Sequence, residues 1–115
     1  MLANRVGWKC SNPDCRRETR GAATEKEDII SIGVASHITA ASKRGPRYDE
    51  KLTAQERASA ENGTWLCQSC SKLIDSDVHR YTVAKLKKWK KISEEMSTLD
   101  LEEVAVRKIM KIKNL

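Results

Sequence analysis

The most regular pattern of apolar and polar positions lies between residues 83 and 96. Apolar side chains recur there at intervals of three and four, and lysines occupy many of the positions between them. This spacing predicts an amphipathic helix that packs one face inward and leaves its lysines outside. The inward positions are Val83, Leu86, Trp89, Ile92 and Met96.

A second helical pattern occupies residues 97–115. Ser97 and Thr98 are favourable N-cap residues, the next turns are acidic and the last turns are basic, an order that complements the helix dipole. We therefore expect a separate amphipathic helix that packs on the body, pairs with a second copy in a homodimer, or leads into a fused effector domain. Its apolar positions are Leu101, Val104, Ala105, Ile109 and Ile112.

Short extended segments and turns precede these helices. Residues 29–38 are rich in β-branched side chains and partly alternate, which predicts a strand. Thr53 and Glu56 have the spacing of a capping box, so a helix is expected to begin there. It ends near the turn dipeptide Asn62-Gly63, and the residues that follow predict a short apolar strand.

With 115 residues, the chain has the length of one domain, which we place at residues 1–96 with residues 97–115 as a helical appendage. The mixture of short strands and helices predicts the α+β class. There is no phenylalanine, aromatic residues make up 4% and charged residues 33%. The hydrophobic core of such a chain is marginal, so a second source of stability is expected.

Four cysteines in two close pairs offer that second source. Cys10 and Cys15 enclose four residues, and Cys67 and Cys70 enclose two. Such knuckles bring four thiolates within reach of one tetrahedral zinc ion, and the ion is then structural because protein fills all its positions. Thiolates gather around the ion only in the folded state, so zinc binding is expected to be part of folding.

Two disulfides are the alternative use of these cysteines, and they are typical of small secreted proteins. The N-terminal residues 1–9 contain no apolar region of a signal peptide. No run approaches the roughly 20 apolar residues that span a bilayer. We therefore predict a zinc-binding, cytoplasmic protein with no membrane partner.

The balance of charge is basic. The chain carries 22 Lys and Arg residues against 16 Asp and Glu residues, a formal net charge of +6. Zinc held by four thiolates contributes about −2, which leaves about +4 for the metal-bound protein. This charge favours an anionic partner such as DNA, although a lysine-rich helix face is also a common solvated surface.

The order of landmarks along residues 8–91 resembles that of the HNH endonucleases. A C-x4-C knuckle is followed by a strand ending in Ser36-His37-Ile38, then by Asn62-Gly63, a short strand, a C-x2-C knuckle and a helix. The resemblance implies a ββα-metal fold that hydrolyses DNA phosphodiesters with Mg²⁺ or Mn²⁺. It makes His37 the general base, since imidazole has an ordinary pKa of about 6.5, and Asn62 the residue that orients it.

A basic, turn-forming loop lies between these landmarks. Arg47 follows a rigid proline, and its guanidinium suits bidentate contact with a DNA phosphate. Lys43 and Arg44 are expected to hold the DNA backbone with it. Phosphate contacts carry no sequence information by themselves, so we expect little sequence specificity from this module.

Two positions depart from the HNH pattern. Family members often carry a metal-binding Asp or His before the first histidine and a histidine after the last knuckle cysteine, where this chain has Ser36 and Ser71. Hydroxyls are poor ligands for divalent cations compared with carboxylate or imidazole. If Ser71 opens a helix, Asp75 lies on the same side one turn later and becomes the candidate ligand for the catalytic cation. Asp77 and His79 are the alternative ligands. The ordinary roles are an N-cap of the next helix for Asp75 or Asp77 and a surface residue for His79.

The sequence thus supports three functional hypotheses. The first is a metal-dependent, HNH-like endonuclease that cuts DNA. The second is a relative that keeps the fold, has lost the metal site, and binds nucleic acid or docks a protein. The third, a secreted nuclease toxin, fits the basic charge, but we identify no translocation region in the sequence.

Overall fold

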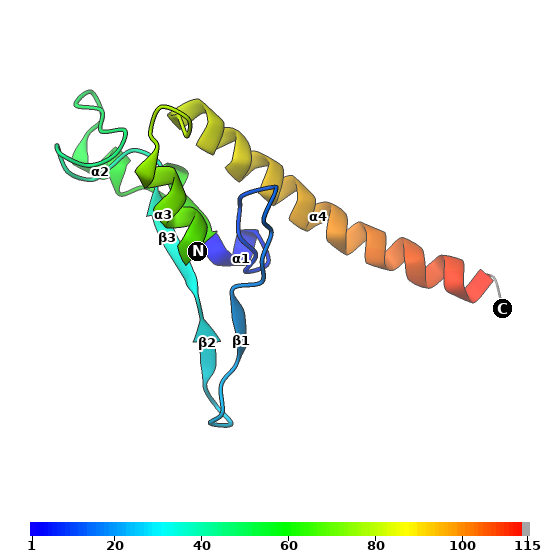
Figure 1. Ribbon diagram of the computed structural model, residues 1–115. Helices are drawn as coiled ribbons and strands as arrows, with labels where there is room; N and C mark the ends of the chain where they lie inside the picture. The colour runs from blue at the N-terminus through cyan, green and yellow to red at the C-terminus, as the bar shows by residue number, and fades with distance from the viewer. Residues whose placement is uncertain (114–115) are drawn as a thin grey trace.

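The computed structural model describes the backbone of residues 1–113 and the side chains of residues 1–102. Two separate antiparallel sheets are formed, β1 with β2 and β3 with β4. The predicted α+β class is confirmed (Figure 1). The elements are helix α1 (Leu2–Arg5), strands β1 (Arg20–Ala22), β2 (Ile29–Ser31) and β3 (Gly33–His37), helix α2 (Ala54–Arg57), the 3-10 turn η1 (Ala60–Asn62), strand β4 (Gly63–Cys67), and helices α3 (Gln68–Ser76) and α4 (Val83–Lys113).

Strands β3 and β4 and helix α3 form a ββα unit at the centre of the fold. The strands pair from Gly33 opposite Cys67 to His37 opposite Gly63. Helix α3 begins directly after β4, with Cys67 as its N-cap. The second knuckle therefore lies at a strand-to-helix junction, which fixes its two cysteines against both elements.

The segment expected as one strand, residues 29–38, is divided at Ile32. The N–H of Ile32 donates to the carbonyl of Thr19 at 2.8 Å, and its carbonyl accepts from Gln68 at 3.2 Å. This residue therefore leaves one sheet and leads into the next. Hairpin β1–β2 projects from the body (Figure 1), and Ile29 and Ile30 are 58% and 53% exposed.

The capping box predicted at Thr53 is confirmed. Its hydroxyl accepts from the Glu56 N–H at 3.0 Å, and its own N–H donates to the Glu56 carboxylate at 2.8 Å. Helix α2 nevertheless has only four residues. The hydroxyl of Ser59 donates to the Glu56 carbonyl at 2.7 Å, which takes up a helix-terminal acceptor and closes the helix locally. The predicted strand after Asn62 is present as β4.

The core lies among β4, α3 and the first turns of α4. The rings of Tyr81 and Trp89 meet edge to face, with centroids 5.6 Å apart, and close one side of it. Burial of Leu86 and Trp89 confirms the inward face predicted for residues 83–96. The fully buried large apolar side chains are Ile38, Leu66, Ile74 and Leu86.

Helix α4 has no break at Ser97. The prediction that Ser97 and Thr98 cap a new helix is wrong, because α4 runs unbroken from Val83 to Lys113. Thr98 Oγ1 instead donates to the Glu94 carbonyl at 3.4 Å, which satisfies the hydroxyl without ending the helix. Leu101 is 75% exposed. The other predicted stripe positions, Val104, Ala105, Ile109 and Ile112, lie outside the residues whose side chains are described.

The middle of α4 is fastened to the first knuckle. Ser93 Oγ donates to the Ser11 carbonyl at 2.7 Å, and the Arg16 guanidinium lies 3.0 Å from the Asp100 carboxylate. Beyond this contact the helix extends away from the body (Figure 1). In the described part of the chain, no helix combines the length and apolar character needed to cross a membrane.

Candidate functional site

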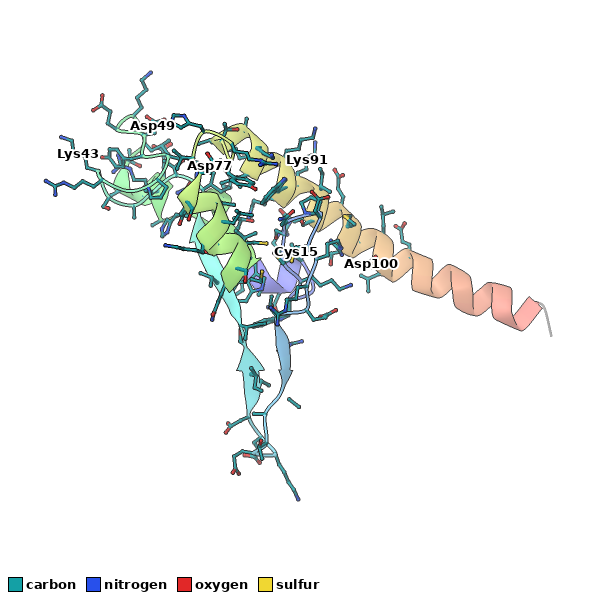
Figure 2. All side chains as sticks on the ribbon, viewed as in Figure 1. Cys15, Lys43, Asp49, Asp77, Lys91 and Asp100 are labelled. Carbon is teal, nitrogen blue, oxygen red and sulfur yellow. The ribbon has the colours of Figure 1, made fainter. Side chains whose placement is uncertain are left out.

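The two cysteine pairs, far apart in the sequence, meet in one cluster near the middle of the molecule (Figure 2). All four cysteines are described, none forms a disulfide, and Cys15 alone is exposed. The disulfide alternative is therefore not supported by the structure. The sulfur atoms of Cys10, Cys15, Cys67 and Cys70 all lie within 4.8 Å of one another.

N–H groups point at the sulfur atoms of this cluster. The backbone N–H of Cys70 donates to Cys67 Sγ at 3.4 Å, and the side-chain amide of Asn12 donates to Cys70 Sγ at 3.5 Å. Such donors stabilise negative charge on sulfur and orient metal ligands. Four sulfur ligands with this outer layer fit a structural zinc ion, which would take all four thiolates in a tetrahedral arrangement.

Burial affects the pKa values of three of the four thiols. Burial raises the pKa of Cys70 to about 11 and also raises the pKa of Cys10. Burial opposes ionisation of Cys67 too, but hydrogen bonds from the Cys70 N–H and the neighbouring thiols outweigh it, so the pKa of Cys67 is lowered. Cys10 and Cys70 are thus protonated in the metal-free cluster at neutral pH, and a bound cation would hold them as thiolates.

Asn12 shapes the first knuckle. Its side-chain oxygen accepts from the Asp14 N–H at 3.0 Å, and its carbonyl accepts from the Cys15 N–H at 2.9 Å. These bonds form a turn between the two cysteines. Sequence reasoning missed the contact of its amide with Cys70, because an asparagine in a knuckle is typical of a turn and gives no local signal of a sulfur partner.

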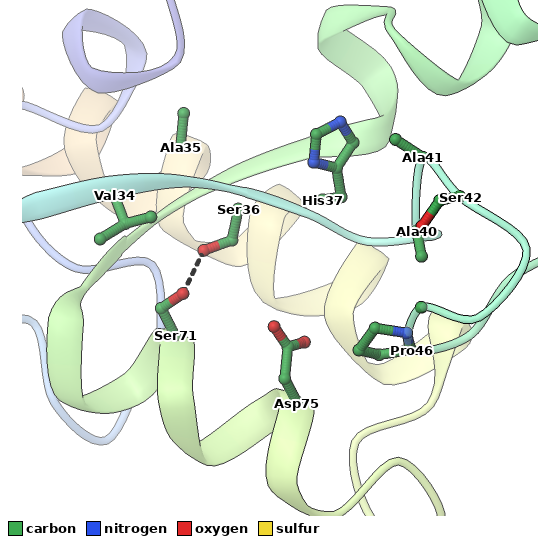
Figure 3. A pocket seen from close by; sticks show the side chains of 11 residues that line it. Val34, Ala35, Ser36, His37, Ala40, Ala41, Ser42, Pro46, Ser71 and Asp75 are labelled. Atoms are coloured by element: carbon green, nitrogen blue, oxygen red, sulfur yellow. Dashed lines mark hydrogen bonds between the residues drawn. The ribbon is translucent and has the colours of Figure 1, made fainter.

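A cleft of about 310 Å³ lies between β3, α3 and the loop at residues 40–46. Ser36, Ser71 and Asp75 line it, and a hydrogen bond of 2.8 Å joins Ser36 Oγ to Ser71 Oγ (Figure 3). Ser71 and Asp75 share one side of α3, as their spacing in the sequence predicts. The two hydroxyls at the positions where the HNH resemblance implies metal ligands therefore bond to each other across the cleft.

His37 lies at the end of β3, and its ring is exposed. Figure 3 shows the ring on the other side of the strand from the Ser36 side chain, as the alternation of a strand requires. The ring lies at the edge of the cleft that contains Asp75 and also lines a second cleft below α2. The structure thus brings the expected base and the expected cation ligand to one cleft, on different sides of β3.

Asn62 holds the chain immediately after His37. Its amide donates to the Thr39 carbonyl at 2.8 Å, and its side-chain oxygen accepts from the Thr39 N–H at 2.9 Å. The Asn62 carbonyl also accepts from the Ile38 N–H at 2.8 Å. The residue is buried, with 6% of its surface exposed. Asn62 therefore fixes the backbone of residues 38 and 39, and has no hydrogen bond to the His37 side chain among the described residues.

Arg47 is a structural residue, which corrects the phosphate contact expected from the sequence. Its side chain is only 4% exposed and lies 2.7 Å from the Asp75 carboxylate. The guanidinium also donates to the carbonyls of Ile38, Ile74 and Tyr81, at 2.7, 2.9 and 3.3 Å. Because the protein itself uses these donors, the guanidinium is not open to an incoming phosphate. The backbone takes the left-handed conformation at this residue, with φ 57°.

The other candidate residues lie outside the cleft lining. Lys43 and Arg44 are exposed on the loop at the rim of the cleft, and Lys43 lies far from Cys15 (Figure 2). Asp77 Oδ1 accepts from the Arg80 N–H at 3.3 Å, so this carboxylate stabilises a turn. Neither Asp77 nor His79 lines the cleft, and His79 is exposed.

Comparison of the sequence with protein-family models and with curated proteins gives no match. The HNH resemblance therefore rests on the order of the residues themselves. What the structure establishes is a small α+β domain whose four clustered cysteines are suited to a metal ion.

Proposed function

We propose that this chain is a zinc-stapled, HNH-like module that binds DNA and does not cleave it unaided. The hydrogen bond between Ser36 and Ser71 carries the proposal. These hydroxyls stand where the resemblance implies metal ligands, and Mg²⁺ sites in proteins ordinarily use one or two carboxylates. The carboxylate that lines the cleft, Asp75, is already paired with Arg47. The cleft therefore lacks a ready cation site.

Charge supports DNA as the partner. Lys43 and Arg44 are exposed beside the cleft, and neither forms an ion pair with a described carboxylate. Together with the net charge of +6, this leaves two cations free to neutralise backbone phosphates at the rim. Contact with phosphates would fix DNA over the cleft without reading its sequence.

An endonuclease is the second candidate function, and one observation favours it. His37 and Asp75 line the same cleft, and the Asp75 side chain is 44% exposed. If Asp75 took up a divalent cation, the cation would polarise the scissile phosphate and His37 would remove a proton from the attacking water. This candidate requires Asp75 to turn from Arg47 toward the cation.

DNA binding is tested by fluorescence anisotropy with a labelled duplex over a range of salt concentrations. We expect affinity to fall steeply with salt, and the double variant Lys43→Gln/Arg44→Gln to reduce the log–log slope by roughly 2, about 0.9 for each lost phosphate contact. The charge-matched control is Arg17→Gln/Lys26→Gln, whose residues are exposed and do not line the cleft. Affinity that is flat with salt would exclude DNA as the partner.

Cleavage is tested with supercoiled plasmid and the zinc-loaded protein in Mg²⁺ or Mn²⁺. We expect DNA binding without nicking. Nicking that requires the divalent cation and is lost in both His37→Ala and Asp75→Ala, with zinc content unchanged, would replace our proposal with the endonuclease.

A further inference from the structure

Strand β2 is an exposed edge strand with an apolar sequence. Hairpin β1–β2 projects from the body, and every residue of both strands is exposed (Figure 1). Ile29 and Ile30 are 58% and 53% exposed, and successive side chains of a strand point to opposite faces. Each face of the hairpin therefore presents one large apolar side chain to solvent. Proteins commonly protect such an edge with a charged side chain or a proline, and β2, whose sequence is Ile-Ile-Ser, contains neither.

The hydrogen bonds of the hairpin show which backbone groups of β2 are free. The N–H of Ala23 donates to the Asp28 carbonyl at 3.1 Å, and the bonded pairs of an antiparallel ladder recur at every second residue. Ile30, two residues after Asp28, is therefore bonded to β1. Ile29 and Ser31 direct their N–H and carbonyl groups to the other side. In the described part of the chain, no other segment bonds to these groups.

The two ends of the hairpin carry opposite charge. The turn between the strands has three carboxylates against one lysine, and two exposed arginines lie at the base. None of these carboxylates and arginines forms an ion pair with a described residue, whereas Glu18 at the base is paired with Lys9 at 3.8 Å. The carboxylates belong to Glu25, Glu27 and Asp28, and the arginines are Arg17 and Arg20. A second hairpin that ran antiparallel to this one would bring its acidic turn toward these arginines.

We propose that two copies of this chain form a dimer by pairing their β2 strands edge to edge into a four-stranded antiparallel sheet. Two-fold symmetry places Ile30 opposite its counterpart in the second copy, and Ile29 opposite Ser31. Ile29 and Ser31 then exchange backbone hydrogen bonds through the groups that are free in one copy. Ile30 and its counterpart form a non-hydrogen-bonded pair, the type in which side chains lie closer together.

The opposite charges at the two ends of the hairpin favour a second copy as the occupant of this edge. Antiparallel pairing sets each acidic turn beside the other copy's arginines, whereas the two acidic turns lie at opposite ends of the new sheet. A four-stranded sheet is also more stable than an isolated two-stranded hairpin. This dimer rests on the hairpin alone and does not require that the chain bind DNA.

The dimer is tested by sedimentation equilibrium of the zinc-loaded protein. The interface is small, so we expect a weak, reversible dimer that becomes populated between about 10 µM and about 1 mM protein. Ile30→Lys should weaken dimerisation at least about tenfold, because it removes apolar contact and places like charges directly opposite each other. Ile30 is already exposed, so this variant should fold, which amide spectra and zinc content verify. A wild-type protein that is monomeric over the whole range would refute the proposal.

The matched control is Leu99→Lys. Leu99 is 57% exposed and lies on α4, outside the hairpin, so the variant should dimerise as the wild type does. Loss of the dimer in Leu99→Lys with a normal dimer in Ile30→Lys would place the interface on α4 and refute pairing through β2.

Amide hydrogen exchange tests the register of the two strands. The N–H groups of Ile29 and Ser31 should exchange more slowly as the protein concentration rises, because they are bonded only in the dimer. The N–H of Ile30 is bonded within its own hairpin, so its exchange should depend much less on concentration. A dimer that leaves Ile29 and Ser31 unprotected would show that the copies meet elsewhere, and would overturn the proposal.

Discussion

The guanidinium of Arg47 reaches from the loop after β3 to the carboxylate of Asp75 on α3, with 2.7 Å between the nearest nitrogen and oxygen. The partners differ in their surroundings, because the Arg47 side chain is 4% exposed and the Asp75 side chain 44%. Most of what Arg47 contributes therefore comes from the three backbone carbonyls that it satisfies, and less from the ion pair, which solvent screens.

The first prediction compares how much Arg47 and Asp75 each contribute to the free energy of unfolding. Arg47→Ala should lower the free energy of unfolding by about 3 kcal/mol or more, because buried carbonyls lose their donors at about 1–3 kcal/mol each. Asp75→Asn should cost no more than about 1 kcal/mol, as partly exposed ion pairs do. Urea unfolding of the zinc-loaded proteins measures both. Equal losses in the two variants would mean that the ion pair, and not the carbonyl contacts, is the main contribution of Arg47.

The second prediction places in the first cleft the metal ligands that the HNH resemblance implies. If the hydroxyls of Ser36 and Ser71 are what prevents cation binding, the double variant Ser36→Asp/Ser71→His should nick plasmid DNA in the presence of Mg²⁺ or Mn²⁺. A third change, His37→Ala, should abolish the gained activity, because the base is then removed.

The matched control for this experiment is Ser36→Ala/Ser71→Ala. It breaks the same hydrogen bond but supplies no ligand, so it should not nick DNA. A folded aspartate–histidine variant that binds no divalent cation, as measured by calorimetry, would contradict the assignment of this cleft as the former metal site.

Local patterns in the sequence predicted the parts of this fold that are themselves local. The knuckle spacings, the capping box at Thr53 and the inward face of residues 83–96 each depend on residues a few positions apart, and the structure confirms their geometry. The helix break at Ser97 was mispredicted because a capping residue signals a possible start, while a hydroxyl within a helix can bond to its own preceding turn.

The structural role of Arg47 could not be predicted from the sequence, for a different reason. An arginine in a basic loop indicates a phosphate contact only while its surroundings are unknown, and here the surroundings are carbonyls of the residue after β3, of α3 and of the turn before α4.

The third prediction concerns the zinc centre and pH. Burial raises the pKa values of Cys10 and Cys70, so zinc must displace protons from these thiols when it binds. Added protons compete with the metal, so affinity should fall as pH is lowered from neutral and rise as pH is raised. Zinc release during acid titration, followed with a chromogenic chelator, measures the effect, and elemental analysis at neutral pH should give about one zinc per chain.

Variants of the second knuckle provide the control for this prediction. Cys67→Ser should lose the ion and most of the folded structure, because the binding energy of the metal is also folding energy. Ser69→Ala changes an exposed residue of the same knuckle and should keep both. Full zinc content with an unaltered fold in Cys67→Ser would show that Cys67 is not a required ligand.

The last prediction uses two glycines, Gly33 and Gly21, which lie in the two separate sheets. A Cβ at Gly33 would overlap the ring of Trp65, which is held by an edge-to-face contact with Trp8 at 5.3 Å and by a hydrogen bond to Thr19 at 2.9 Å. Gly33→Ala should therefore destabilise the protein by about 1–3 kcal/mol, the usual cost of overpacking, and alter tryptophan fluorescence. At Gly21 nothing lies within 4 Å of an added Cβ, so Gly21→Ala should change stability by less than about 0.5 kcal/mol. Urea unfolding of the pair decides whether the indole of Trp65 is fixed in place, since equal stabilities would mean that the ring moves aside freely.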